Sequence, residues 1–155
     1  MQIDTWIEFD ETKLNELLKK NYLCTQEFEK ILMNKKLRIY VLTENVYKIA
    51  KRMKINSAGL YLGRLKRNEK IQLSVEGAQL IGKKAKKNVV LINEQQALKY
   101  LKGENISFEK AIKCEVNNFV ILKTRRYIIG SGIFRGEFVE NLLPKSRRII
   151  TNVSL

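Results

Sequence analysis

Apolar residues recur at helical spacing in three places in the first half of the chain. The three groups are Leu14, Leu17 and Leu18; Phe28, Ile31 and Leu32; and Val46, Ile49, Ala50 and Met53. Each group predicts a helix, and we interpret the apolar stripes as core positions. Asp10 or Thr12 stands just before the first group, where a polar side chain can cap the first turn of a helix.

Between and after these groups the pattern changes to that of strands. The segments KLRIYVLT (36–43), LYLGRLK (60–66) and KIQLSV (70–75) are rich in β-branched, aromatic and other apolar residues. The last two are separated by residues 67–69, which predict a hairpin turn. Helices early in the chain and antiparallel strands later predict an α+β fold.

The second half of the chain predicts a small β-barrel with one helix attached. NVVLI (88–92) predicts a buried strand, and a short helix is expected over residues 94–101, with Asn93 as its N-cap and Gly103 as a left-handed residue at its end. Four short apolar segments follow, with turn residues between them: ISFEKAIKCEV (106–116), NNFVILKT (117–124), RRYIIGSGIF (125–134) and RRIITNV (147–153). Closely spaced short strands of this kind are typical of small barrels.

The glycines of YIIGSGIFRGEF (127–138) could suggest a phosphate-binding loop. Gly130, Gly132 and Gly136 are spaced one residue too widely for the dinucleotide fingerprint, which also needs a crossover helix, a second strand and an acidic residue about 20 positions further on. We therefore interpret the segment as a strongly curved strand, in which glycine permits a bend or a close backbone approach. A closed barrel requires such curvature.

The chain is strongly basic, with 30 Lys and Arg against 16 Asp and Glu and a formal charge of +14. Residues 1–34 hold 4 basic and 7 acidic side chains (net −3), residues 35–87 hold 15 and 3 (net +12), and residues 88–155 hold 11 and 6 (net +5). This distribution indicates a polyanionic partner, and nucleic acid is the first candidate. An anionic membrane is the competing candidate, but no segment shows a clean basic amphipathic helix.

Several classes of site are excluded or disfavoured by composition. The chain has no histidine, which removes Ser/His triads and most zinc sites with nitrogen ligands. Cys24 and Cys114 are far apart and form no CxxC pair, so they predict buried free thiols. No apolar run predicts a signal peptide or a membrane span, and we expect a soluble protein of a reducing compartment, without metal or cofactor.

The order of these elements resembles the PUA domain, named after pseudouridine synthase and archaeosine transglycosylase. The upstream block, residues 59–106, is similar to the Nip-seven family of ribosome-biogenesis factors. Its shared features are two glycines around a strand (Gly59 and Gly63), a basic turn, a β-to-helix segment and a Glu before the short helix (Glu94). The chain departs from the wider PUA pattern at Asn117 and Asn118, where a Gly-Asp turn is frequent, and near Lys110, where a glycine is expected.

The resemblance implies a two-domain protein, with an α+β pre-PUA domain over residues 1–84 and a PUA domain over 85–155. The lysine-rich junction, with no Pro or Ser, predicts a short, tight connection. The resemblance further implies a non-catalytic monomer that binds pre-ribosomal RNA and other assembly proteins during maturation of the large ribosomal subunit. Such a protein is expected in the cytoplasm if archaeal, which its compact form favours, and in the nucleolus or nucleus if eukaryotic.

Basic side chains supply most of the affinity for RNA, and aromatic rings can stack on unpaired bases. The candidate RNA-binding residues are Lys145, Arg147, Arg148, Arg135, Lys123, Arg125 and Arg126. A secondary basic surface comprises Arg64, Lys66, Arg67, Lys83, Lys84, Lys86 and Lys87. The C-terminal three rank first because the family's PUA domain uses basic residues near its last strand; the alternative for them is a charged strand edge. Of Tyr127 and Phe134, at least one is expected to face the core.

Two other functions compete with RNA binding by a non-enzymatic factor. One is a PUA-containing component of an RNA-modifying enzyme, which the short first half disfavours because it lacks a glycine-rich strand-to-helix loop. The other is a protein–protein adaptor whose charge serves solubility. The acidic N-terminal third could recruit a protein partner in either setting.

Overall fold

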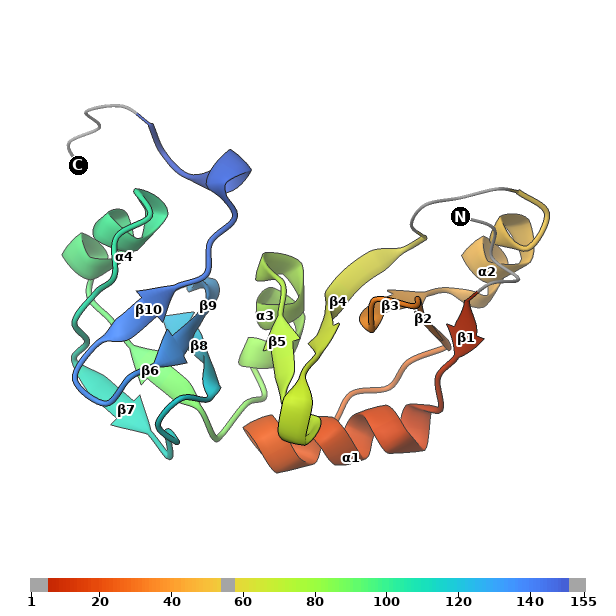
Figure 1. Cartoon of the computed structure of the whole chain (residues 1–155), viewed down its shortest axis with the longest axis horizontal. Coiled ribbons are helices and arrows are strands. Elements are labelled where there is room, and N and C mark those ends of the chain that lie inside the picture. The colour runs from red at the N-terminus through yellow and green to blue at the C-terminus, as the bar shows by residue number, and fades with distance from the viewer. Residues whose placement is uncertain (1–5, 54–57, 151–155) are drawn as a thin grey trace.

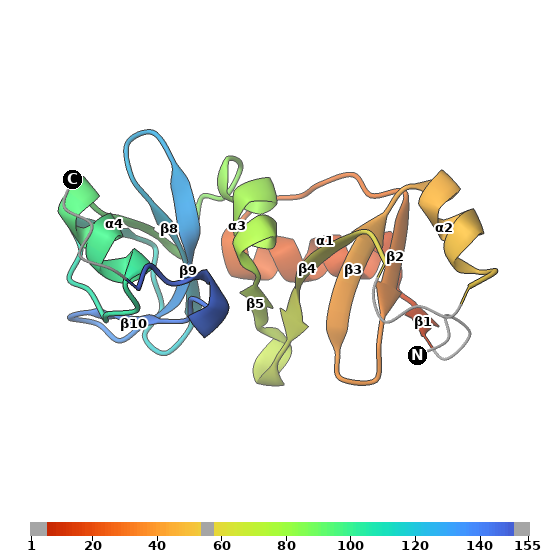
Figure 2. The ribbon, with the colours of Figure 1, turned by 90° about the horizontal axis from the view of Figure 1, so that it is seen from above.

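The computed structural model describes residues 6–53 and 58–150, which form two five-stranded sheets and four α-helices (Figure 1). The molecule is elongated, with one sheet toward each end, α1 running beneath the first sheet, and α3 in the middle (Figures 1 and 2). The predicted α+β class is confirmed. Within the described residues, no helix combines the length and apolarity needed to cross a membrane.

The first sheet has strand order β1-β2-β3-β4-β5, and every neighbouring pair is antiparallel. Its strands are β1 (Ile7–Glu8), β2 (Lys30–Met33), β3 (Arg38–Leu42), β4 (Leu60–Leu65) and β5 (Ile71–Leu73). The helices of this half are α1 (Glu11–Tyr22), α2 (Glu44–Ala50) and α3 (Val75–Gly82). A 3-10 turn over Arg67–Glu69 joins β4 to β5, as the sequence predicted.

Helix α1 forms where the leucine spacing predicted it. Asp10 is its N-cap, and the carboxylate accepts a hydrogen bond from the Thr12 backbone N–H at 3.0 Å. Leu14, Leu17 and Leu18 are all buried in the core between the helix and the sheet. Burial of three leucines on one face supplies the tertiary packing that a helix of this length needs.

Two of the predicted helical stripes are wrong in part. Ile31 and Leu32 lie in β2, where both are buried because this central strand is covered on its two faces. A short, continuous apolar run fits such a strand as well as a helix, and here sheet pairing decides. The predicted helix at this position does not exist.

Helix α2 does form, but of its predicted apolar stripe only Ala50 is buried in the core. Tyr47 and Ala50 are the buried residues of this helix, whereas Val46, Ile49 and Met53 are 40%, 61% and 57% exposed. Tyr47 packs in a cluster with Trp6 and other aromatics and thereby fixes which side of the short helix faces inward. Val46, Ile49 and Met53 therefore lie on the side that faces solvent.

The second sheet has strand order β10-β9-β8-β6-β7, with β6 and β8 parallel and the other pairs antiparallel. Its elements are β6 (Val89–Leu91), α4 (Glu94–Leu101), β7 (Lys110–Ile112), β8 (Phe119–Lys123), β9 (Ile128–Phe134) and β10 (Val139–Asn141). The segment before β7 also reaches the opposite edge strand, because Ile106 forms an antiparallel bridge with Val139 of β10. This bridge joins the segment before β7 to the opposite edge strand, but the strand order itself is that of an open sheet, and closure into the predicted small barrel stays a prediction.

Helix α4 has the predicted bounds and caps. The Asn93 side chain accepts from the Gln96 backbone N–H, and the Gln96 side chain accepts from the Asn93 backbone N–H, which completes a capping box. Gly103 has φ +94, the left-handed conformation that the sequence predicted for the end of this helix.

The final predicted strand, RRIITNV, is not found in the described part of the chain. Lys145–Arg147 form a 3-10 turn after Pro144, and residues 148–150 belong to no strand. Residues 151–153 of that segment lie outside the described residues. The last strand of the second sheet is instead β10, which pairs with β9 and which the sequence analysis did not predict.

The glycines of β9 mark close approaches, as the curved-strand interpretation required. A side chain at Gly130 would place its Cβ 2.6 Å from the Tyr100 hydroxyl, and one at Gly132 would come within 2.7 Å of the Glu140 carbonyl oxygen. Gly136, with φ +93, lies in the turn that leads to β10. The segment is a packed strand followed by a turn, and no phosphate cradle forms.

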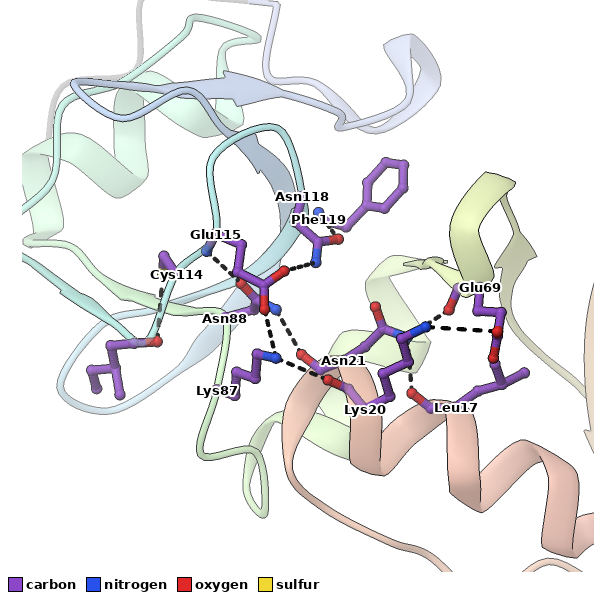
Figure 3. Close-up of polar contacts among 11 residues, drawn as sticks. Leu17, Lys20, Asn21, Glu69, Lys87, Asn88, Cys114, Glu115, Asn118 and Phe119 are labelled. Carbon is purple, nitrogen blue, oxygen red and sulfur yellow. Dashed lines mark hydrogen bonds and ion pairs between the residues drawn. The ribbon is translucent and has the colours of Figure 1, made fainter.

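The two sheets are joined by a network of polar contacts at the end of α1 (Figure 3). Asn88 is fully buried, and its side-chain amide donates to the Asn21 carbonyl at 2.7 Å while its oxygen accepts from the Glu115 backbone N–H at 3.0 Å. Asn21 in turn donates to the carbonyls of Leu17 and Glu69, both at 2.8 Å. The Asn88 side chain therefore connects α1 with the segment between β7 and β8.

Charge and packing strengthen the same junction. The Lys87 ammonium lies 2.6 Å from Glu115 and donates to the Lys20 carbonyl at 3.1 Å. Lys87 lowers the pKa of the Glu115 carboxyl, chiefly through their hydrogen bond. Ile121 of β8 packs within the hydrophobic core of the first sheet, so the apolar interior also crosses between the two sheets. The connection is tight, as expected for the lysine-rich segment.

Asn88 combines two demands that only a few residue types meet, since it has φ +55 and two side-chain hydrogen bonds. We expect Asn88→Gly, which keeps the backbone conformation, to lower the free energy of unfolding by about 1–3 kcal/mol because both hydrogen bonds are removed. Asn88→Ala should cost roughly 1–2 kcal/mol more because the backbone here is left-handed, which an L-residue with a Cβ disfavours. Urea denaturation of the three proteins checks both values, and equal stability of Asn88→Ala and the native protein would contradict them.

Candidate nucleic-acid interface

The structure divides the predicted basic residues into those engaged in contacts within the protein and those that are free. The engaged side chains are Arg64, Lys84, Lys87, Lys123, Arg135, Arg147 and Arg148. Lys66, Arg67, Lys83, Lys86, Arg125, Arg126 and Lys145 have no side-chain hydrogen bond or ion pair to another described residue. A cation without an internal partner can give its full charge to a ligand.

The C-terminal cluster is largely committed to internal contacts. Arg147 forms a hydrogen-bonded ion pair with Glu76 of α3, and this contact crosses between the two sheets. Arg148 donates to the Leu143 carbonyl at 3.1 Å, and its side chain covers Gly103. Lys145 alone of the three has an exposed side chain without such a contact in the described part of the chain. The sequence could not show these partners because Glu76 is 71 positions away.

Arg135 is likewise held by its own sheet. One guanidinium nitrogen donates to Glu140 at 3.0 Å, and another donates to the Asn117 side-chain oxygen at 2.8 Å. The ion pair links the residue that follows β9 to β10. Asn117 is the position at which the sequence departs from the Gly-Asp turn of the wider PUA pattern. Asn117 adopts φ +69, a conformation that asparagine tolerates better than most residues.

The turn between β8 and β9 presents three large exposed side chains in a row: Arg125, Arg126 and Tyr127. In Figure 2 this hairpin projects from the second sheet. Neither arginine head group has an ion-pair or hydrogen-bond partner within residues 6–53 and 58–150. The two free cations are adjacent in sequence and share one turn.

Thr124 fixes the shape of this turn. Its backbone N–H donates to the Tyr127 carbonyl at 2.8 Å, and its hydroxyl oxygen accepts from the Tyr127 backbone N–H at 3.0 Å. The same hydroxyl oxygen accepts from the Arg126 backbone N–H at 3.4 Å. Thr124 is 8% exposed, so the locking contacts are largely shielded from water. The tip is therefore held in one conformation, which reduces the entropy lost on binding.

A pocket of about 580 Å³ lies between this hairpin and the end of α3. Its lining includes the side chains of Lys83, Lys123, Arg125 and Arg126, and none of the described lining residues is acidic. Lys123 donates to the Gly82 carbonyl at 3.3 Å and so holds the base of the hairpin against the helix end. Four cations around one concave site create a field that attracts anions.

A second pocket, of about 500 Å³, lies on the other side of the same two arginines. Its lining includes Glu94 and Glu109, and Glu109 accepts a hydrogen bond from the Asn93 side chain at 2.6 Å. The hairpin thus separates a basic pocket from one that carries carboxylates. An anionic ligand is favoured on the α3 side of the tip.

The secondary basic residues do not form one surface with the hairpin. Arg67 belongs to the β4–β5 turn, and the neighbouring Lys70 donates to the Asn117 carbonyl just before β8, whereas Arg125 follows the far end of that strand. The five residues of β8 lie between these two positions and span about 16 Å at the usual rise of roughly 3.3 Å per residue. Only Lys83 of the secondary set lines the basic pocket with the hairpin residues.

The two aromatic candidates have opposite environments. Phe134 is buried and packs against Phe108 with ring centroids 5.5 Å apart, so it belongs to the core of the second sheet. Tyr127 is 66% exposed and lines the basic pocket. The expectation that at least one of the pair faces the core is confirmed, and Tyr127 is the ring that a ligand can reach.

Sequence reasoning missed two residues of this site. Thr124 closes the turn, and Gln79 contributes to the pocket lining from α3. Thr124 carried a signal, since Thr before two arginines at a hairpin is suited to side-chain contacts with backbone N–H groups. Gln79 carried none, because its place in the pocket depends on how α3 packs against β9.

The other candidate chemistries find little support. Burial raises the pKa of the Cys24 and Cys114 thiols to about 11, so both are poor nucleophiles at neutral pH. Both are free thiols, one buried and one half-buried. Among the described residues, no group of acidic and cysteine side chains has the arrangement of a metal site.

Comparison with known proteins finds similarity in sequence for the second half of the chain and in fold for most of it. Residues 87–149 match the family model described as the methyltransferase RsmF PUA domain. The whole chain is similar in fold to a conserved PUA domain protein from Thermoplasma acidophilum, with a TM-score of 0.61 and 11% identity over 90% of this chain and 93% of that one. A hypothetical protein from the hyperthermophilic archaeon Pyrococcus horikoshii gives a TM-score of 0.56 and 12% identity, covering 89% and 93%. No curated protein matches the sequence.

The Arg147–Glu76 pair makes stability depend on pH in a defined direction. Arg147 lowers the pKa of the Glu76 carboxyl below its ordinary value of 4.5, so the pair stabilises the native state above that value and loses its contribution as the pH falls through the lowered pKa. Both side chains are partly exposed, and we expect Glu76→Gln to cost about 0.2–1 kcal/mol at pH 7. The difference should shrink as the pH is lowered below 4.5; urea denaturation at pH 7 and at acidic pH tests it, and a difference independent of pH would refute it.

Proposed function

We propose that this protein, whose residues 87–149 match a PUA-domain family model, is a non-catalytic RNA-binding factor. PUA domains are in general RNA-binding modules. The observation that carries the proposal is the basic pocket beside the β8–β9 hairpin, where Lys83, Lys123, Arg125 and Arg126 surround a concave surface without an acidic lining residue. Phosphate contacts supply most of the affinity of proteins for RNA, and this site offers several cations in reach of one another.

The hairpin ranks above the C-terminal cluster within this proposal. Arg147 and Arg148 are already bonded to Glu76 and to the Leu143 carbonyl, so binding RNA there would exchange one partner for another. Arg125 and Arg126 break no side-chain hydrogen bond or ion pair to a described residue when they meet a phosphate. Lys145 and Arg135 can extend the same interface only at its margin, because neither lines the basic pocket.

Ribosome assembly is the cellular process we propose for this RNA-binding activity. The support is the similarity of residues 59–106 to the Nip-seven family, together with the fold shared over most of the chain with a PUA domain protein. We propose the corresponding division into a pre-PUA domain, residues 1–84, and a PUA domain, residues 85–155. In this view the protein acts as a monomer on pre-ribosomal RNA of the large subunit and contacts other assembly proteins.

Binding to a short single-stranded RNA across a salt series tests the RNA interface. The Arg125→Ala/Arg126→Ala variant should bind more weakly, and the slope of log affinity against log salt should fall by about 1–2, at roughly 0.7 for each phosphate that is no longer neutralised. The native fold is expected to persist because both side chains are exposed at a turn. Fluorescence anisotropy of a labelled RNA gives the affinities, and thermal melting confirms the fold.

Two matched variants control this measurement. Lys35→Ala/Lys36→Ala removes the same charge from the exposed β2–β3 turn, which lies on the opposite side of the molecule in Figure 2, and should leave the slope nearly unchanged. Arg147→Ala/Arg148→Ala should mainly reduce stability. If that variant has a reduced slope and the hairpin variant does not, the C-terminal cluster is the RNA site; an equal reduction in all three would indicate a diffuse charge effect, and no binding by the native protein would favour the adaptor function.

A further inference from the structure

We propose that the pocket beside the β8–β9 hairpin binds one unpaired nucleotide of the RNA, with its base stacked on Tyr127 and its phosphate among the surrounding cations. This inference rests on the proposed RNA binding and specifies the ligand of that site. It assigns a role to an aromatic ring whose exposure has no explanation in the packing of the protein.

Tyr127 has the placement that stacking requires. Its side chain is 66% exposed although its two strand neighbours, Ile128 and Ile129, are half-buried. The ring lines the same pocket as Lys83 and Lys123, so an apolar face and positive charges border one space. A nucleotide offers the complementary pair of features, a flat base and a phosphate.

The volume and rigidity of the site fit one nucleotide. At about 580 Å³, the pocket falls within the range of roughly 300–1,000 Å³ that is usual for small-ligand sites. The Thr124 contacts fix the Tyr127 backbone at the edge of the pocket before the ligand arrives. Lys123, bonded to the Gly82 carbonyl, is similarly positioned at the base. A preformed site of this size accommodates a single base more readily than the face of a duplex.

Duplex RNA presents a different demand. Its bases are stacked on one another and do not present a free face to a protein ring, so Tyr127 would contribute little to duplex binding. The cations of the pocket would still attract its phosphates. The proposal therefore predicts a preference for single strands that resides in Tyr127 and not in the arginines.

The experiment measures binding of hexa-adenylate RNA and of the same RNA with one abasic position, moved along the strand. Tyr127→Ala should weaken binding of hexa-adenylate about 5- to 100-fold, as expected for loss of one stacked base. Tyr127→Phe keeps the ring and should bind like the native protein. The salt slope should stay unchanged in both variants, because neither removes a charge.

The abasic series shows whether ring and base act together. For the native protein, one abasic position should reproduce most of the weakening caused by Tyr127→Ala, and the two changes combined should cost little more than either alone. Additive effects would overturn the inference, as would equal weakening by Tyr127→Phe or equal affinity for a six-base-pair duplex.

The outcomes separate this inference from the function beneath it. If the native protein binds hexa-adenylate with a steep salt dependence and Tyr127→Ala binds equally well, RNA binding stands and the nucleotide pocket falls. If the native protein binds neither RNA, both proposals fail. Thermal melting of each variant excludes unfolding as the cause, and a change at this exposed tip should leave the melting temperature close to the native value.

Discussion

The fold depends on one fully buried asparagine, Asn88, at the point where the chain passes from the first sheet to the second. An amide in the protein interior must find partners for both its donor and its acceptor, since an unsatisfied polar group there is costly. Asn88 finds them on opposite sides, at the Asn21 carbonyl and the Glu115 backbone N–H. Asn21 belongs to α1 beneath the first sheet, and Glu115 belongs to the second sheet's β7–β8 connection. Both hydrogen bonds of Asn88 therefore form only when the two sheets have this relative position.

The placement of acidic side chains follows from the same need to hold the sheets together in a highly basic protein. Glu115 lies against Lys87 at the junction, and Glu76 lies against Arg147 across the interface. These carboxylates offset positive charge where the sheets approach each other, whereas the pocket on the α3 side of the β8–β9 hairpin has no acidic residue in its lining. The excess charge is therefore concentrated at surfaces that face solvent, where it can act on a polyanion at long range.

Elements with local signals were predictable, and those decided by tertiary packing were not. The caps of α1 and α4 and the β4–β5 turn could be predicted from adjacent residues, because capping and turn contacts span only a few positions. Ile31 and Leu32 were assigned to a helix because a short apolar run has no period that distinguishes a buried strand. The basic residues could be predicted as groups of charges, but which of them are paired within the protein could not, since Arg147 meets Glu76 only in the folded chain.

The basic pocket draws its lining from both sheets' regions, with Lys83 at the end of α3 and Tyr127 on the hairpin of the second sheet. A ligand that contacts both residues would add a further contact between the two halves of the molecule. By thermodynamic linkage, a molecule that binds only when these parts are correctly packed must stabilise that packing by an amount set by its concentration and affinity. Occupancy of one surface pocket would then slow hydrogen exchange at the backbone N–H of the buried Asn88. A substitution that loosens the junction would weaken binding of the ligand by the same free energy.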